Sequence, residues 1–171
     1  KDIDKIAQKI KNKEVKGVIA VVGCVNPRAA PAEKWVDVFK KLSKDYVILT
    51  TGCMAFEFGR NGLLDGERFF HLGSCVNNSR VAEVFKRISD KLNKKITDLP
   101  FLVSAPMPIT EKSVSIGMFF ASLGCDMHFG YPFLISSDTK VAEFFANILD
   151  KKFDSIIYLA VSYTHLRAHE T

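Results

Sequence analysis

The sequence predicts an α/β fold: a doubly wound, mainly parallel, Rossmann-like sheet flanked by helices. Short apolar runs of strand length alternate with segments of helical periodicity, and the connections between them are short. The chain has 171 residues, enough for one domain with a sizeable core, and no repeat, low-complexity stretch or linker divides it. We therefore expect a single Rossmann-like domain over residues 1–160.

The first half of the chain supplies three expected strands and one expected helix, after a lysine-rich helical start. Residues 17–23, 46–52 and 69–74 are apolar runs typical of buried strands in a parallel sheet. Pro31, after the first of these runs, suits the first position of a helix. The apolar residues that follow have the i, i+3, i+4, i+7 spacing of a buried helix face, and they are Trp35, Val38, Phe39 and Leu42.

The second half of the chain continues the alternation. Asn78 or Ser79 can cap a helix whose apolar face consists of Val81, Val84, Phe85, Ile88 and Leu92. Residues 101–104 are expected to form a short fourth strand, and residues 155–160 a last one. Before that last strand, Asp138 can cap a helix that buries Val141, Phe144, Phe145, Ile148 and Leu149.

A helix expected over residues 110–123 differs from the others because it has almost no polar face. Its apolar residues are Val114, Ile116, Met118, Phe119, Phe120 and Leu123, which predicts a helix buried nearly all round. Its first turn nevertheless carries Glu111 and Lys112. A cation there opposes the helix dipole at a cost of ~0.3–1 kcal/mol, so the Lys112 ammonium would welcome an anion.

Composition and charge narrow the class of protein. Hydrophobic residues make up 47% of the chain and charged residues 25%, as in soluble globular proteins. The lysines behind the net charge of +5 fall mainly on the polar faces of helical segments, so we expect a solvated surface and no nucleic-acid partner. No apolar run approaches the roughly 18 residues that cross a bilayer, and no signal peptide opens the chain, which predicts a cytoplasmic protein without a membrane span.

Both ends of the chain have unusual features. It starts at Lys1 without an initiator methionine, and residues 161–171 resemble the translation of a transposase-type sequencing adapter. We expect this tail not to be native, so His165 and His169 are not counted as metal ligands. We also expect the chain to be a fragment of a larger protein.

Three cysteines occupy equivalent places in successive segments. Cys24, Cys53 and Cys75 each follow a small residue where an expected strand ends. The carboxyl ends of parallel strands meet at one edge of the sheet, so three thiolates from separate loops can face one point in space. In a reducing cytosol such cysteines are more often metal ligands, catalytic groups or buried thiols than disulfides. The pattern favours a metal–sulfur cluster.

Longer motifs surround these cysteines. They are Val22-Gly-Cys-Val-Asn-Pro27, Thr50-Thr-Gly-Cys53, His71-Leu-Gly-Ser-Cys-Val-Asn-Asn-Ser-Arg80 and Ser104-Ala-Pro-Met-Pro-Ile-Thr-Glu-Lys-Ser-Val-Ser-Ile-Gly117. In these motifs the chain resembles the C-terminal Rossmann-like domain of anaerobic nickel–iron–sulfur carbon monoxide dehydrogenases, in the prismane/hybrid-cluster superfamily. The resemblance covers residues 1–160, roughly the last quarter of such an enzyme.

The resemblance implies a role for five residues. Cys24 and Cys53 would bind irons of a [Ni-4Fe-4S] cluster, and Cys75 would be the thiolate on nickel. Lys112 would match the catalytic lysine that hydrogen-bonds the bound carboxylate and assists proton movement. Ile116, one helical turn further along, would match the apolar residue that shields the nickel. The remaining ligands, and additional 4Fe-4S clusters, would lie upstream of this chain.

The resemblance also implies substrates and partners. Carbon monoxide and water would be converted reversibly to carbon dioxide, two protons and two electrons, with a ferredoxin-type protein as electron carrier. The full-length enzyme would be a homodimer, and acetyl-CoA synthase or a hydrogenase would be candidate partners. The isolated fragment is expected to be inactive.

Two other functions stay open from the sequence. A hybrid-cluster, hydroxylamine-reductase-like protein would share the architecture and the strand-end cysteines, but would contain iron without nickel. A metal-free Rossmann-like binding module would use the cysteines only for core packing, although no Gly-x-Gly-x-x-Gly follows the first strand. Cys125 matches no motif and is interpreted as a buried thiol, and His71 and His128 as hydrogen-bonded core histidines.

Overall fold

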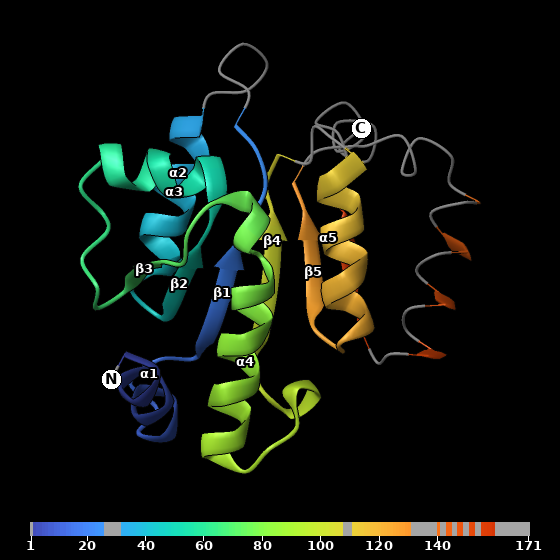
Figure 1. Ribbon diagram of the computed structural model, residues 1–171, viewed down its shortest axis with the longest axis horizontal. Helices are drawn as coiled ribbons and strands as arrows, with labels where there is room; N and C mark the ends of the chain where they lie inside the picture. Colours follow the sequence, from blue (N-terminus) through green and yellow to red (C-terminus); the bar gives the residue numbers. More distant parts are fainter. Residues whose placement is uncertain are drawn as a thin grey trace, which may run out of the picture.

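The structure, a computed structural model, describes residues 2–25, 32–107 and 111–130, followed by residues 140, 143–144, 147–148, 151–152 and 155–159. Within these residues one parallel sheet has the strand order β3-β2-β1-β4-β5-β6 (Figure 1). Its strands are β1 (Gly17–Val21), β2 (Tyr46–Thr50), β3 (Phe69–His71), β4 (Phe101–Ala105), β5 (Asp126–Phe129) and β6 (Ile157–Leu159). The predicted doubly wound α/β fold is confirmed.

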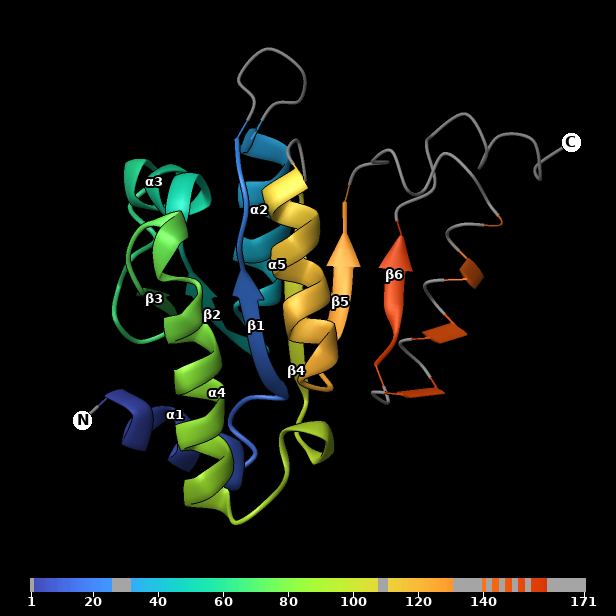
Figure 2. The same ribbon diagram turned by 45° about the vertical axis from the view of Figure 1, so that its right-hand side comes forward.

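Helices cover both faces of the sheet. They are α1 (Asp2–Lys11), α2 (Ala32–Leu42), α3 (Gly52–Arg60), α4 (Ser79–Leu92) and α5 (Glu111–Ser122), with short 3-10 turns η1 (Cys75–Asn77) and η2 (Ile96–Asp98). Helices α1, α4 and α5 pack on one face and α2 and α3 on the other (Figures 1 and 2). The chain changes face after β3, so the loops that follow β1 and β4 leave the sheet in opposite directions. None of the helices in the described part of the chain has the length and apolar character that a membrane span needs.

The core consists of two layers separated by the sheet. Strand β1 is buried on both faces, as the continuous apolar run predicted. On one face Phe85 of α4 stacks on Phe101 of β4, with ring centroids 4.3 Å apart. On the other face Phe58 of α3 meets Phe39 of α2 edge to face at 5.8 Å. These aromatic contacts fix the helices against the strands.

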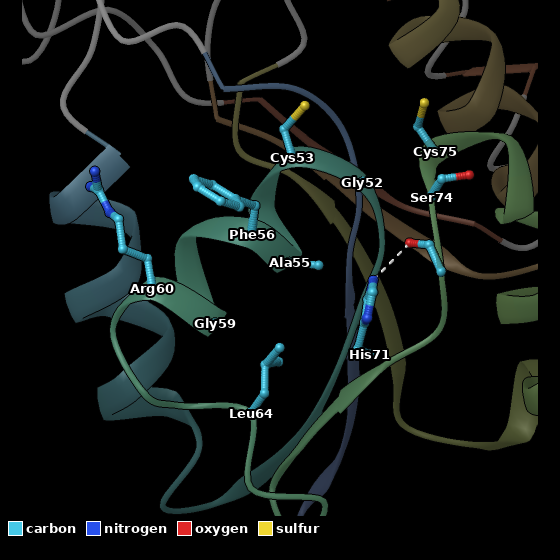
Figure 3. Close-up of a pocket in the computed structure, with 11 residues that line it drawn as sticks. Gly52, Cys53, Ala55, Phe56, Gly59, Arg60, Leu64, His71, Ser74 and Cys75 are labelled. Carbon is cyan, nitrogen blue, oxygen red and sulfur yellow. Dashed lines mark hydrogen bonds between the residues drawn. The ribbon is translucent and has the colours of Figure 1, made fainter.

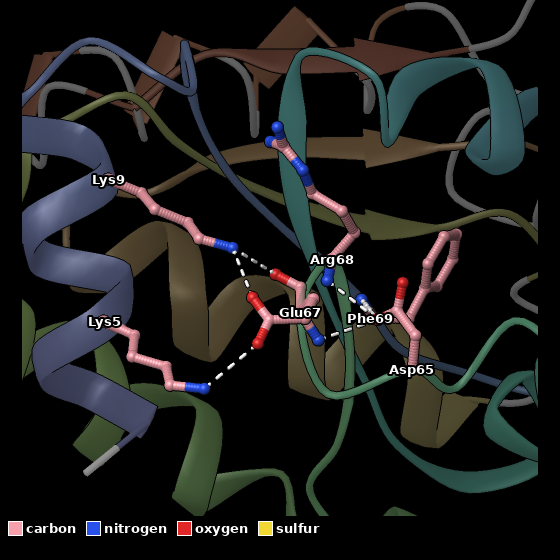
Figure 4. Close-up of polar contacts among 6 residues, drawn as sticks. All are labelled: Lys5, Lys9, Asp65, Glu67, Arg68 and Phe69. Carbon is pink, nitrogen blue, oxygen red and sulfur yellow. Dashed lines mark hydrogen bonds and ion pairs between the residues drawn. The ribbon is translucent and has the colours of Figure 1, made fainter.

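A polar connection holds α1 against the segment that leads into β3 (Figure 4). The Glu67 carboxylate accepts hydrogen bonds from Lys5 at 3.0 Å and Lys9 at 2.9 Å. Hydrogen bonds from these two lysines hold the pKa of Glu67 below its ordinary value. Asp65 shapes the same segment, because its Oδ1 accepts the backbone N–H groups of residues 67–69. Burial alone would raise the pKa of Asp65, but these N–H groups lower it.

Besides the short 3-10 turns, the structure adds a helix and a strand that the sequence did not indicate. Helix α3 occupies part of the segment between Cys53 and Cys75, where no helix was expected. Its nine residues include Gly59, and the run is too short for a clear helical period. Strand β5 has only four residues and starts with Asp126, so it lacks the apolar run that marked the other strands.

Some predicted burial is wrong. Helix α5 is not buried all round, because Phe119 is 45% exposed and only the side toward Gly117 and Phe120 meets the sheet. Val38 of α2 is exposed, and Val36 takes its place in the core. Phe144 is 61% exposed instead of buried. Pro31, the Asp138 cap, most of the helix expected after it, and the tail 161–171 lie outside the described residues.

Candidate metal centre at the carboxyl edge of the sheet

Cys24 lies at the point where the sheet changes its winding direction. It follows β1 after a turn at Gly23, whose φ of +106° is a conformation that favours glycine. The side chain is half-buried, and its Sγ lies 4.0 Å from the Oγ of Ser113 in the first turn of α5. Cys24 therefore stands between the loops after β1 and β4, where ligands of doubly wound folds bind.

Cys53 lies in the first turn of α3 and is exposed. Gly52 before it has a φ of +66°, and a Cβ at that position would lie 3.2 Å from the Cβ of Cys75 and 3.4 Å from the carbonyl oxygen of Gly23. The segments that carry all three cysteines therefore meet at Gly52. A side chain there would push them apart, which gives the small residue before Cys53 a physical reason.

Cys75 opens the 3-10 turn η1 and is exposed. The loop before it is fixed by Asn77, whose Oδ1 accepts hydrogen bonds from the backbone N–H and the hydroxyl of Ser74. The N–H of Gly52 donates to the carbonyl oxygen of Gly73 at 3.0 Å, which ties this loop to the start of α3. The loop of Cys75 is thus shaped by the Asn77 side chain and held beside the segment of Cys53 by a backbone hydrogen bond.

Cys53 and Cys75 share a largely apolar pocket of about 660 Å³ between α3 and the loop after β3 (Figure 3). Figure 3 shows both thiol side chains at its rim, pointing the same way. Phe56, Leu64 and His71 line it further in. The two exposed thiols therefore border a space large enough for a bulky group.

Two helices start beside these thiols. Cys53 belongs to the first turn of α3, and the first turn of α5 contacts Cys24 through Ser113. The amino ends of helices carry a partial positive charge, which attracts a negatively charged group bound beside them.

The residues predicted beside the cluster lie on α5. Lys112 is the second residue of the helix, is exposed, and directly precedes Ser113, which touches Cys24. Ile116 is half-buried one turn further along and packs against the core under α5. Both therefore belong to the helix whose first turn approaches Cys24. Their roles toward a substrate stay predictions.

The interpretation of His71 as a core residue is wrong. It is exposed, it lines the pocket of Cys53 and Cys75, and its Nε2 is 3.1 Å from the carbonyl oxygen of Gly73. Its place at the end of a three-residue edge strand explains the exposure. In the sequence, the neighbouring phenylalanines suggested a buried strand instead.

His128 and Cys125 agree with the sequence interpretation. His128 is half-buried on β5, and its Nδ1 shares a hydrogen bond of 2.8 Å with the Ser104 hydroxyl. Burial lowers the pKa of His128. Cys125 is buried, and its burial, with a smaller effect of Asp126, raises the pKa of the thiol to about 12.

The donor set fits a polynuclear cluster better than a single ion. Among the described residues, no group of three His, Cys, Asp or Glu side chains is close enough to hold one metal ion. Cys53 and Cys75 instead share one pocket, and the segment of Cys24 approaches both of theirs at Gly52. In an iron–sulfur cluster each thiolate binds a different metal atom, so spread donors of this soft type suit it.

Known proteins are similar to most of this chain. A family model described as the Prismane/CO dehydrogenase family matches residues 1–161. "Carbon monoxide dehydrogenase 1" of Carboxydothermus hydrogenoformans is 32% identical over 162 residues, which cover 78% of this chain and 26% of that protein. "Carbon monoxide dehydrogenase" of Rhodospirillum rubrum is 27% identical over 154 residues, 73% of this chain and 24% of the relative. The chain thus spans about a quarter of the length of these relatives.

Solved structures share the fold. "Carbon Monoxide Dehydrogenase IV from Carboxydothermus hydrogenoformans" superposes with a TM-score of 0.83 at 24% sequence identity. The match covers 97% of this chain and 31% of that chain. The six-stranded arrangement is therefore found as one part of a larger protein.

Proposed function

The chain belongs to the Prismane/CO dehydrogenase family, and from that premise we propose that it is the thiolate-bearing Rossmann-like part of a nickel–iron–sulfur carbon monoxide dehydrogenase. The reaction is the reversible oxidation of carbon monoxide by water to carbon dioxide, two protons and two electrons. The observation that supports it is the convergence of the Cys24, Cys53 and Cys75 segments at one edge of the sheet. Homologues of the family carry the name carbon monoxide dehydrogenase.

We assign the three thiolates as ligands of one [Ni-4Fe-4S] cluster, with Cys24 and Cys53 on irons and Cys75 on nickel. When bound, the cluster supplies the metal that takes up carbon monoxide and accepts its electrons. The protein's part is to hold the thiolates in place and to keep the rim apolar. Gly23 and Gly52 let the backbone come close to such a bulky group.

Lys112 is the proposed catalytic residue of this chain. Its exposed ammonium group sits at the start of α5, beside the residue that contacts Cys24. It can donate a hydrogen bond to the carboxylate that forms from carbon monoxide, and it can pass a proton toward solvent. Ile116 would keep water from the metal on the same side, because its aliphatic side chain offers no hydrogen bond.

The remaining ligands of the cluster and further 4Fe-4S clusters are proposed to come from the rest of the enzyme. We propose a homodimer that passes electrons to a ferredoxin-type carrier. One relative, from Moorella thermoacetica, is named "Carbon monoxide dehydrogenase/acetyl-CoA synthase subunit beta". An acetyl-CoA synthase is therefore a candidate partner for this enzyme as well.

The experiment that tests this function uses the full-length enzyme, produced without oxygen and with nickel in the medium. We expect the wild type to contain iron and nickel and to reduce a viologen dye with carbon monoxide. Cys75→Ala should lose nickel and activity. Lys112→Ala should keep both metals and lose most of the activity, about 100-fold or more.

Cys125→Ala is the matched control, because this thiol is buried away from the rim. It should keep metals and activity. Iron without nickel in the wild-type enzyme, or full activity of Lys112→Ala, would contradict the proposal.

A further inference from the structure

Asn78 is a buried amide that connects the segments of Cys53 and Cys75. It is 6% exposed. Its Oδ1 accepts a hydrogen bond of 2.6 Å from the hydroxyl of Thr51, two residues before Cys53. Its Nδ2 donates a hydrogen bond of 2.7 Å to the carbonyl oxygen of Cys75 itself. One side chain thus reaches from the end of β2 to the backbone of the third cysteine.

Both partners in this connection occupy helix N-cap positions without using them for capping. Thr51 is the N-cap residue of α3, and Asn78 is the N-cap residue of α4. Neither side chain makes a capping hydrogen bond to its own helix. Threonine and asparagine at this position commonly accept a backbone N–H of the first turn. Here they bond to each other and to Cys75, so the connection replaces the local interaction that both residue types favour.

The chemistry of the connection requires an amide. One group of the side chain must accept a hydrogen bond from the Thr51 hydroxyl, and another must donate a hydrogen bond to the Cys75 carbonyl oxygen. Asparagine has both groups on one short side chain. An aspartate could accept but not donate, and an alanine could do neither. Because the groups are buried, losing one partner leaves another unsatisfied.

We propose that Asn78 is a positioning residue that sets the separation of Cys53 and Cys75 before any metal binds. The bond from the Gly52 N–H to the Gly73 carbonyl oxygen holds the loop before Cys75, and Asn78 ties the carbonyl of Cys75 itself to Thr51 at the end of a core strand. The inference rests on the proposed function only for the identity of the group that the two thiols hold. The preset thiol geometry itself belongs to the metal-free protein.

The test measures the geometry of the two thiols in the full chain without metal. Cys24→Ala and Cys125→Ala serve as the background, so that only Cys53 and Cys75 react. The chain is treated with bifunctional thiol reagents of graded length, and intramolecular cross-links are counted by mass spectrometry. We expect one preferred length in this background, and Asn78→Ala and Thr51→Val should lower the yield at that length about fivefold and spread it over other lengths.

Two variants separate positioning from general damage to the fold. Thr51→Ser keeps the hydroxyl and should keep the preferred cross-linker length. Thr51→Val keeps the side-chain volume without the hydroxyl and should lose this preference. Ser79→Ala, at the exposed neighbour of Asn78, should behave like the background. If Asn78→Ala does not fold, as judged by far-UV circular dichroism, Thr51→Val and Thr51→Ser decide the question.

A second readout uses the full-length enzyme with its metals. Asn78→Ala should alter the electron paramagnetic resonance signal of the cluster and lower the metal content of the enzyme. Thr51→Ser should keep the wild-type signal and the wild-type metal content. Unchanged cross-linking in both Asn78→Ala and Thr51→Val overturns the positioning role. An enzyme without nickel or carbon monoxide oxidation overturns the proposed function instead, and leaves the cross-linking result standing.

Discussion

At the scale of single residues, the four cysteines separate into two kinds. Cys53 and Cys75 are exposed and Cys24 is half-buried, all at one edge of the sheet, while Cys125 is enclosed in the core. The sequence places all four next to a glycine or a serine, so the neighbouring residues alone do not separate them. Burial separates the two kinds of cysteine, because a thiol without access to water or a metal behaves as a small apolar side chain.

This difference predicts thiol reactivity. In the folded, metal-free chain at pH 8, Cys53 and Cys75 should react readily with a disulfide reagent, whereas Cys125 should react only after unfolding. A thiol pKa of about 12 in place of 9.0 leaves about a thousandfold less thiolate at that pH, in addition to the lack of access. Mass spectrometry after timed labelling measures each site. Labelling of Cys125 at the rate of Cys75 would show that its burial is wrong.

His128 predicts a dependence of stability on pH. Burial lowers the pKa of this imidazole in the folded state, so the unfolded chain takes up its proton first as the pH falls. The contribution of neutral His128 is therefore complete above the unfolded pKa of about 6.5 and is lost as the pH falls below it. Denaturant unfolding of wild type and His128→Gln between pH 8 and pH 5 should show a smaller acid-side loss in the variant.

His71 provides the control for this prediction. Its side chain is exposed, so His71→Gln should show the same acid-side loss of stability as the wild type. A His128→Gln profile parallel to wild type would mean that His128 is not the group that responds.

At the scale of elements, α5 depends on a close approach to β5. A Cβ at Gly117 would lie 2.2 Å from the Phe129 Cζ and 3.0 Å from the Met127 Cε, and both of these side chains are fully buried. The glycine therefore sets how near the helix lies to the sheet. The same helix carries Lys112 and Ser113 to the rim, so its packing also positions that part of the candidate site.

Gly117→Ala should consequently destabilise the chain. Overpacking at a buried contact costs about 1–3 kcal/mol in the free energy of unfolding. The distance of only 2.2 Å to Phe129 places this cost in the upper part of that range, above the gain of about 1 kcal/mol that alanine brings to a helix interior. Urea unfolding measures the difference. Ser122→Ala, at an exposed position of the same helix, should change stability by less than about 0.5 kcal/mol, and a Gly117→Ala chain as stable as wild type would contradict the close packing.

At the scale of the whole molecule, the sequence predicted the sheet well because its central strands are buried on both faces. Such strands appear as continuous apolar runs, and β1 and β2 start where predicted. The prediction failed for elements whose secondary structure is determined by tertiary contacts. Strand β5 is apolar only at Met127 and Phe129, and α3 is defined by its packing in the second core layer more than by its period.

The candidate site was predictable in part for the same reason. Parallel strand ends share an edge, so Cys24, Cys53 and Cys75 could be placed together from the sequence. The exposure of His71 and the connection through Asn78 could not be predicted from the sequence, because both depend on how the loop after β3 folds back on β2. A polar residue expected to cap a helix instead joins two loops, and only the structure distinguishes these uses.

The central claim is that the thiols of Cys24, Cys53 and Cys75 bind one inorganic cluster. Metal analysis of cysteine variants tests this claim most directly. Iron and nickel per protomer should be measured in the anaerobically purified full-length enzyme for Cys24→Ala, Cys53→Ala, Cys75→Ala and the control Cys125→Ala. The account predicts that each of the first three variants loses iron or nickel together with the active-cluster signal, while Cys125→Ala matches wild type. Full metal content and an unchanged signal in the first three variants would contradict it.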